Sequence, residues 1–150
     1  LRNISSRFKY SCFVNIVEEM ELNLYPESQR SVLFDLLSYA NKIELNRLVL
    51  TTHSPYVINY LTLAAKAFLL TQKVSANETL QERVKEVVPA DSAIDPARLR
   101  IYELKDGGVF RLSTYEGLPS DENFLNIQLG VTNELFDQLL EIEQESDYKN

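Results

Sequence analysis

Phe13-Val-Asn-Ile-Val-Glu-Glu19 and Leu48-Val-Leu-Thr-Thr-His53-Ser-Pro55 are two short, mostly apolar segments that end in groups able to do chemistry. The first ends in two adjacent carboxylates, and the second ends in the only histidine of the chain. Apolar runs of this length, too short for a helix, are typical of buried strands. The two segments therefore predict two strands that carry polar groups at their carboxyl ends.

One amphipathic helix is predicted between these strands. Pro26 suits a first helical turn, where its missing N–H is not needed, and apolar side chains recur every three or four residues over Val32–Ala40. Strand, helix and strand in this order predict a parallel βαβ core, which makes the fold class α/β. A second helix is predicted to begin with Ser54 as N-cap and Pro55 as first helical residue, and to end near position 72.

The rest of the chain predicts a helix near residues 78–88, then a β-hairpin and C-terminal helices. Asp106-Gly107-Gly108 lies between two strand-like runs, and hairpin turns of this kind need positive φ. Gly130 predicts a break, with Thr132 or Asn133 capping a last helix. That helix is predicted to bury one apolar face, formed by Leu135, Phe136, Leu139, Leu140 and Ile142.

The composition is that of a soluble globular domain, with 45% hydrophobic and 25% charged residues. A net charge of −7 argues against a nucleic-acid groove, which needs clustered Lys and Arg. The sequence has neither a membrane-spanning run nor a secretory core, and the single Cys12 is expected to be buried and inert. We therefore expect a cytoplasmic protein, and the lack of a starting Met leads us to expect a chain cut from a longer one.

The polar groups at the two strand ends are candidates for a catalytic site. Neighbouring parallel strands lie about 4.8 Å apart, and ligands bind at their carboxyl ends in open α/β sheets, so Glu18, Glu19 and His53 are expected to meet there. One carboxylate can hold Mg²⁺, the other can orient a water, and the histidine can bond a terminal phosphate or the same water. Phosphoryl transfer needs little from a protein beyond such positioning and charge stabilisation. Adjacent glutamates are also common as solvated charges at a helix start, and a single histidine is also common as a polar turn residue.

At these residues the chain resembles an ATP-binding-cassette-type ATPase head, closest to RecF-like and overcoming-lysogenization-defect-like ATPases, which are relatives of structural-maintenance-of-chromosomes heads. The family's Walker B strand and D-loop resemble residues 17–29, and its switch-histidine segment resembles residues 50–58. The resemblance implies a P-loop NTPase-like fold. It also implies that Glu18 helps to hold Mg²⁺, that Glu19 is the catalytic carboxylate and that His53 senses the γ-phosphate of ATP.

The resemblance further implies an interface loop, which is the D-loop that meets a second head in a homodimer: Leu22, Asn23, Leu24 and Tyr25. Met20 stands where the family usually has Pro, and Asn15 is unusual in a Walker B strand. A larger departure is that no G-x-x-x-x-G-K-[S/T] phosphate loop occurs in the chain. We therefore expect the carboxyl-terminal half of a head, with residues 1–73 as its βαβ core and residues 74–150 as the C-terminal part of the same domain.

The resemblance thus implies that ATP and Mg²⁺ bind only in the intact protein, where a missing amino-terminal half supplies Walker A. DNA or an effector protein would act through other domains, and the isolated chain would be inert. Two alternatives stay open: a non-enzymatic interaction domain with a vestigial site, and a stand-alone Mg²⁺-dependent phosphohydrolase or nuclease. The latter needs further carboxylates, for which the sequence offers Asp35, Asp91, Asp95 and Asp106.

Overall fold

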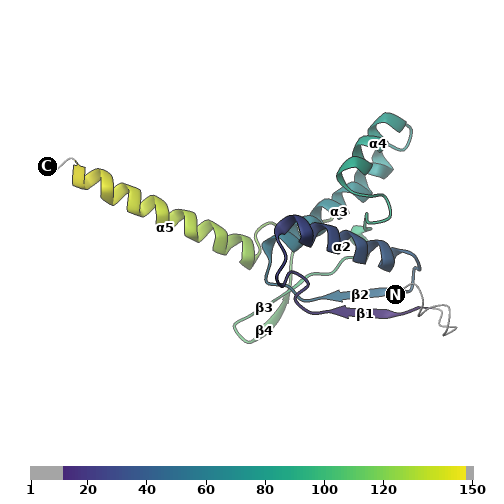
Figure 1. The fold of residues 1–150 in the computed structure, drawn as a ribbon, viewed down its shortest axis with the longest axis horizontal. Helices are drawn as coiled ribbons and strands as arrows, with labels where there is room; N and C mark the ends of the chain where they lie inside the picture. Colours follow the sequence, from purple (N-terminus) through teal and green to yellow (C-terminus); the bar gives the residue numbers. More distant parts are fainter. Residues whose placement is uncertain (1–11, 148–150) are drawn as a thin grey trace. The chain divides into compact units, whose positions relative to one another are not determined.

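The computed structural model describes residues 12–147, which fall into two compact units. Unit 1 contains the described residues up to 99 together with 115–118, and unit 2 contains residues 100–114 and those from 119 onward. Both helices and small sheets are present, which confirms the predicted mixed α/β class (Figure 1).

Unit 1 is built on the strands β1 (Val14–Val17) and β2 (Arg47–Leu50), with α2 (Pro26–Asn41) between them in the chain. The two strands pair in parallel, and Ile16 lies opposite Val49. Pro26 occupies the first turn of α2, as the sequence predicts. Because the strands are parallel, both of their carboxyl ends lie at the same edge of the pair.

The core of unit 1 lies between α2 and α3 (Pro55–Lys73). Leu33 and Val57 are fully buried, and the rings of Phe34 and Tyr60 meet edge to face with centroids 6.4 Å apart. Both helices contribute apolar side chains at intervals of three or four residues, so their stripes can interlock. The buried residues of this core are Leu33, Phe34, Leu37, Val57, Ile58, Leu61, Ala64, Ala65 and Ala67.

The chain then forms α4 (Glu78–Val87) and returns to the two core helices. The side chain of Asn77 caps α4 by accepting a hydrogen bond from the Leu80 N–H at 3.0 Å. After α4, the Ser92 hydroxyl donates to the Phe34 carbonyl on α2 at 2.9 Å, and the Ile94 N–H donates to the Ala64 carbonyl on α3 at 3.2 Å. A short 3₁₀ helix, η1 (Pro96–Arg98), follows. This returning segment fixes α2 and α3 relative to each other.

Within the described residues of unit 1, one face of the β1–β2 pair has no element over it, which contradicts the prediction of buried strands. Figure 1 shows α2 over one face of the pair, and no other element of unit 1 over the opposite face. Val14, Ile16 and Val49 point to that open face, and Ile16 is 65% exposed. Cys12, predicted to be buried, is also exposed. The apolar sequences of β1 and β2 are compatible with cover on both faces, as is normal for parallel strands. They carry no information on whether the same unit supplies an element for each face, and unit 1 supplies α2 over one face only.

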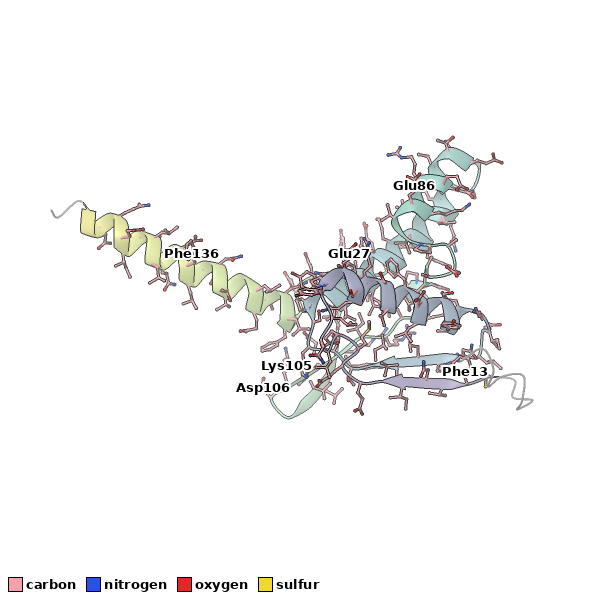
Figure 2. All side chains as sticks on the ribbon, in the orientation of Figure 1. Phe13, Glu27, Glu86, Lys105, Asp106 and Phe136 are labelled. Carbon is pink, nitrogen blue, oxygen red and sulfur yellow. The ribbon has the colours of Figure 1, made fainter. Side chains whose placement is uncertain are left out.

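Unit 2 contains the predicted hairpin, formed by β3 (Tyr102–Lys105) and β4 (Gly108–Arg111) in antiparallel pairing. Asp106 and Gly107 form the two-residue turn with φ of 51° and 73°, the positive values that such turns require. Figure 2 labels Lys105 and Asp106 at this turn. Two further short strands follow at the boundaries between the two units, β5 (Thr114–Tyr115) and β6 (Leu118–Pro119), and only β6 was not predicted.

The C-terminal helices predicted from the sequence are a single helix, α5 (Phe124–Asp147). Asn123 caps it by accepting a hydrogen bond from the Asn126 N–H at 3.0 Å. Gly130 does not break the helix, and Thr132, predicted as a cap, lies in its interior with its hydroxyl donating to the Gln128 carbonyl. A glycine costs a helix only about 1 kcal/mol relative to alanine, which is too little to interrupt a helix of this length.

The predicted buried face of α5 is exposed. Figure 2 shows Phe136 projecting from the helix, and its side chain is 60% exposed. The spacing of the apolar residues is correct for one helix face, but the side chains of that face are exposed among the described residues. The exposed side chains are Leu135, Phe136, Leu139, Leu140 and Ile142. None of the helices among residues 12–147 is long and apolar enough to span a membrane.

Candidate functional site

The carboxyl ends of β1 and β2 are joined by hydrogen bonds that continue beyond the strands. The Thr51 N–H donates to the Val17 carbonyl at 3.1 Å. The Glu19 N–H in turn donates to the Thr51 carbonyl at 3.0 Å, and it also lies 3.1 Å from the Thr51 hydroxyl oxygen. The segments that carry the carboxylates and the histidine are therefore held side by side at one edge of the sheet.

The structure brings together the two residues expected to be catalytic. His53 Nε2 lies 3.4 Å from Glu19 Oε1, and their side chains are 82% and 42% exposed. Glu19 has a φ of 46°, in the left-handed region that residues with a side chain seldom adopt. Backbone strain of this kind is concentrated at functional sites. Glu18, the expected Mg²⁺ ligand, is exposed in the bend directly after β1.

The interface loop follows these carboxylates and exposes apolar side chains. Leu22 and Tyr25 are both largely exposed, whereas Met20, in the same turn, is buried. The turn is closed by the Leu22 N–H, which donates to the Glu19 carbonyl at 3.0 Å. Asn23 has a φ of 60° within it. The loop is thus an ordered turn that presents two large apolar side chains to whatever approaches this edge.

The sequence did not indicate a role for two polar residues of the site. Glu21 Oε1 accepts a hydrogen bond from the His53 N–H at 2.5 Å. Gln29 is buried on α2, where its Oε1 accepts from the Ser54 hydroxyl at 2.7 Å and its Nε2 donates to the Leu24 carbonyl at 2.9 Å. A signal for Gln29 existed, because it lies one helical turn before Leu33 on the buried stripe of α2.

Ser54 departs in part from its predicted role. It occupies the N-cap position of α3, as predicted, but its side chain does not cap the helix. The hydroxyl instead donates to Gln29, and the Ser54 N–H donates to the Thr52 hydroxyl oxygen at 3.0 Å. Ser54, which follows His53, is therefore bonded to Gln29 on α2, the helix that begins directly after the interface loop.

The donor atoms at this edge suit Mg²⁺ held partly by a nucleotide. No cluster of three or more His, Cys, Asp or Glu side chains that could hold a metal ion occurs in the described part of the chain. Mg²⁺ at phosphate sites needs only one or two carboxylates, with phosphates and waters completing its coordination, and Glu18 could provide one of them. Asp91 and Asp95 instead accept hydrogen bonds from the Ser38 hydroxyl at 2.7 Å and the Ala97 N–H at 2.9 Å, respectively.

An α/β unit with a carboxylate pair and a histidine at the ends of neighbouring strands is consistent with a P-loop-like ATPase domain. Residues 14–59 match the family described as "AAA domain, putative AbiEii toxin, Type IV TA system". The matched range covers β1, α2, β2 and the start of α3, which includes both halves of the site. The match supports an AAA-type, nucleotide-binding ATPase family for this segment. No curated protein and no solved structure matches the chain.

Proposed function

We propose that this chain is the carboxyl-terminal half of an ATP-hydrolysing head of the ATP-binding-cassette type, related to RecF-like, overcoming-lysogenization-defect-like and structural-maintenance-of-chromosomes ATPases. The observation that carries the proposal is the 3.4 Å approach of Glu19 and His53 at the ends of two parallel strands. Support comes from their position inside the range that matches an AAA domain. Residues 1–73 form the core of this half, and residues 74–150 complete the same domain.

In this proposal Glu19 acts on the attacking water and His53 acts on the γ-phosphate. The Glu19 carboxylate accepts a hydrogen bond from the attacking water and so directs an oxygen lone pair at the γ-phosphorus. His53 donates a hydrogen bond to a γ-phosphate oxygen, where negative charge must be stabilised. Glu18 would hold Mg²⁺ in part, and the bound ion would neutralise charge on the phosphates. The products are ADP and inorganic phosphate.

The proposal also requires parts that this sequence does not contain. A phosphate loop is absent from the sequence, so Walker A comes from an amino-terminal half of the intact protein. The uncovered face of Val14, Ile16 and Val49 supports this requirement, because parallel strands are normally covered on both sides. A second head meets the interface loop, and DNA or an effector protein is engaged through other domains. The 150-residue chain alone is then inactive.

The test is Mg-ATP hydrolysis by the longest natural chain that contains this segment. We expect Glu19→Gln to lower kcat by about 100-fold or more, since positioned acid–base groups contribute roughly that much, while a fluorescent ATP analogue still binds. The matched control is Glu27→Gln, because Glu27 is an exposed carboxylate in the first turn of α2. It should leave kcat unchanged. Equal activity of the Glu19 variant and the wild type would refute the proposal.

The alternative is an interaction domain in which the site is vestigial. The exposed apolar face of α5 is the observation that favours it, because such a face is typical of a binding surface. On this alternative Glu19→Gln leaves every function of the intact protein unchanged. Substitution of Leu135 and Leu139 by glutamine would instead abolish that function.

A further inference from the structure

We propose that Gln29 is a positioning residue that couples the interface loop to the His53 segment, so that contact with residues 22–25 is transmitted to the histidine. This inference rests on the proposed function, and it adds a residue to which the family resemblance assigned no role. It identifies the connection through which a docking partner controls the geometry of the site.

The side-chain amide of Gln29 bonds both segments at the same time. Its Nε2 donates to the carbonyl of Leu24 in the interface loop at 2.9 Å. Its Oε1 accepts from the hydroxyl of Ser54, the residue after His53, at 2.7 Å. Gln29 and Ser54 are only 6% and 7% exposed, and buried polar groups keep their partners because an unpaired one is costly. The two bonds therefore form a fixed connection between the loop and the histidine segment.

Other bonds leave the His53 segment little freedom to move independently of the loop. Thr51, on one side of it, accepts from the Glu19 N–H. The N–H of His53 itself donates to Glu21, the residue directly before the interface loop. The segment is thus attached to the loop region before, at and after the histidine. Leu22 and Tyr25 are the exposed side chains of the interface loop. A partner that contacts them and moves the loop therefore also moves His53.

The chemistry of this connection requires an amide. A side chain at position 29 must accept a hydrogen bond from a hydroxyl and donate one to a carbonyl, which glutamine can do and glutamate cannot when ionised. A leucine of similar size would fill the same space but bond neither partner. The function of the position is therefore separable from its packing.

The test compares two buried serines in the longest natural chain that contains this segment. Ser54→Ala removes the hydroxyl that bonds Gln29, and Ser92→Ala removes a hydroxyl of similar burial that bonds the Phe34 carbonyl on the same helix, α2. Both variants lose one buried hydrogen bond to α2, so their thermal midpoints should fall by similar amounts. Only Ser54→Ala breaks the proposed connection.

We expect Ser54→Ala to lower the kcat of ATP hydrolysis by about 10-fold, with less than about a two-fold change in KM, because misplacing a positioned group lowers the rate of the chemical step. Ser92→Ala should leave kcat within about two-fold of the wild type. Ser54→Thr, which keeps the hydroxyl, should restore kcat. Gln29→Leu combined with Ser54→Ala should be no slower than either single variant, since both remove the same connection. Equal kcat for the Ser54→Ala and Ser92→Ala variants, or additive losses in the double variant, would overturn the proposal.

Hydrogen exchange distinguishes failure of this inference from failure of the proposed function. The amides of residues 22–24 in the interface loop should exchange faster in Ser54→Ala than in Ser92→Ala, although Ser54 lies outside that loop. Unchanged exchange there overturns the coupling, whatever the enzyme activity is. If the wild type hydrolyses no ATP, the proposed function fails, and the effect of Gln29 on hydrolysis fails with it. The exchange comparison then still decides whether the loop and the His53 segment are coupled.

Discussion

Replacing Ile16 by threonine tests whether another polypeptide covers the open face of the β1–β2 pair. Threonine is also β-branched and suits a strand, so the backbone preference is kept. Complete burial of an isoleucine side chain stabilises a protein by about 1.5–3 kcal/mol. Ile16 is 65% exposed, so roughly two-thirds of this free energy, about 1–2 kcal/mol, is gained only when the face is covered.

The assay is hydrogen exchange of the amides that join β1 to β2, measured in the 150-residue chain and in the longest natural chain that contains it. The Arg47 and Thr51 N–H groups donate to carbonyls of the first strand region and report opening of the pair. In the short chain we expect a change of less than about 0.5 kcal/mol, as for exposed sites generally. In the long chain we expect roughly 5- to 30-fold faster exchange, because about 1.4 kcal/mol corresponds to a factor of ten.

Leu33→Ala is the control, because Leu33 is fully buried within unit 1 itself. Its loss should cost about 2–5 kcal/mol, and equally in both chains. If Ile16→Thr also has the same effect in both chains, the face is not covered by the rest of the protein. The argument from the uncovered strands would then be wrong.

Three further substitutions test local features, each by hydrogen exchange of the element concerned. Gly107→Ala should destabilise the β3–β4 hairpin by about 1–2 kcal/mol, the cost of a left-handed backbone for a residue with a side chain, because φ is 73° and the added methyl meets nothing. Gly130→Ala should have the opposite sign and stabilise α5 by about 0.5–1 kcal/mol, since this glycine is helical and its surroundings are open. Asn77→Ala should destabilise α4 by about 1 kcal/mol through loss of the cap to Leu80. Slower exchange of the hairpin amides in Gly107→Ala, or unchanged protection of α4 in Asn77→Ala, would contradict these assignments.

The order of elements in unit 1 could be predicted because each element has a local cause. The strands are indicated by the apolar runs that end at Val17 and Leu50, and the start of α2 is indicated by its proline. Each of these signals lies within the element that it specifies. The approach of Glu19 to His53 followed from this order alone, because parallel strands joined by one helix place their carboxyl ends together. The catalytic roles of these residues stay predictions.

The features that escaped prediction depend on partners far away in the sequence. Gln29 and Ser54 are 25 residues apart, and no local pattern indicates that a hydroxyl at a helix start will bond a distant amide instead of capping its own helix. The predictions of which side chains are buried were wrong for a related reason. The apolar spacing of α5 specifies a face that can be buried, but burial also requires a second surface, and the helix sequence carries no information about that surface.

The exposed position of Cys12, the only cysteine in the chain, has a practical consequence. Thiol reagents such as maleimides react at accessible cysteines, so a single reagent marks one defined point just before β1. No thiol has to be engineered, and no other cysteine competes within these 150 residues. The natural sequence thus provides a chemical reporter beside the open sheet face, and a fluorophore attached there would respond to a polypeptide that comes to lie on it.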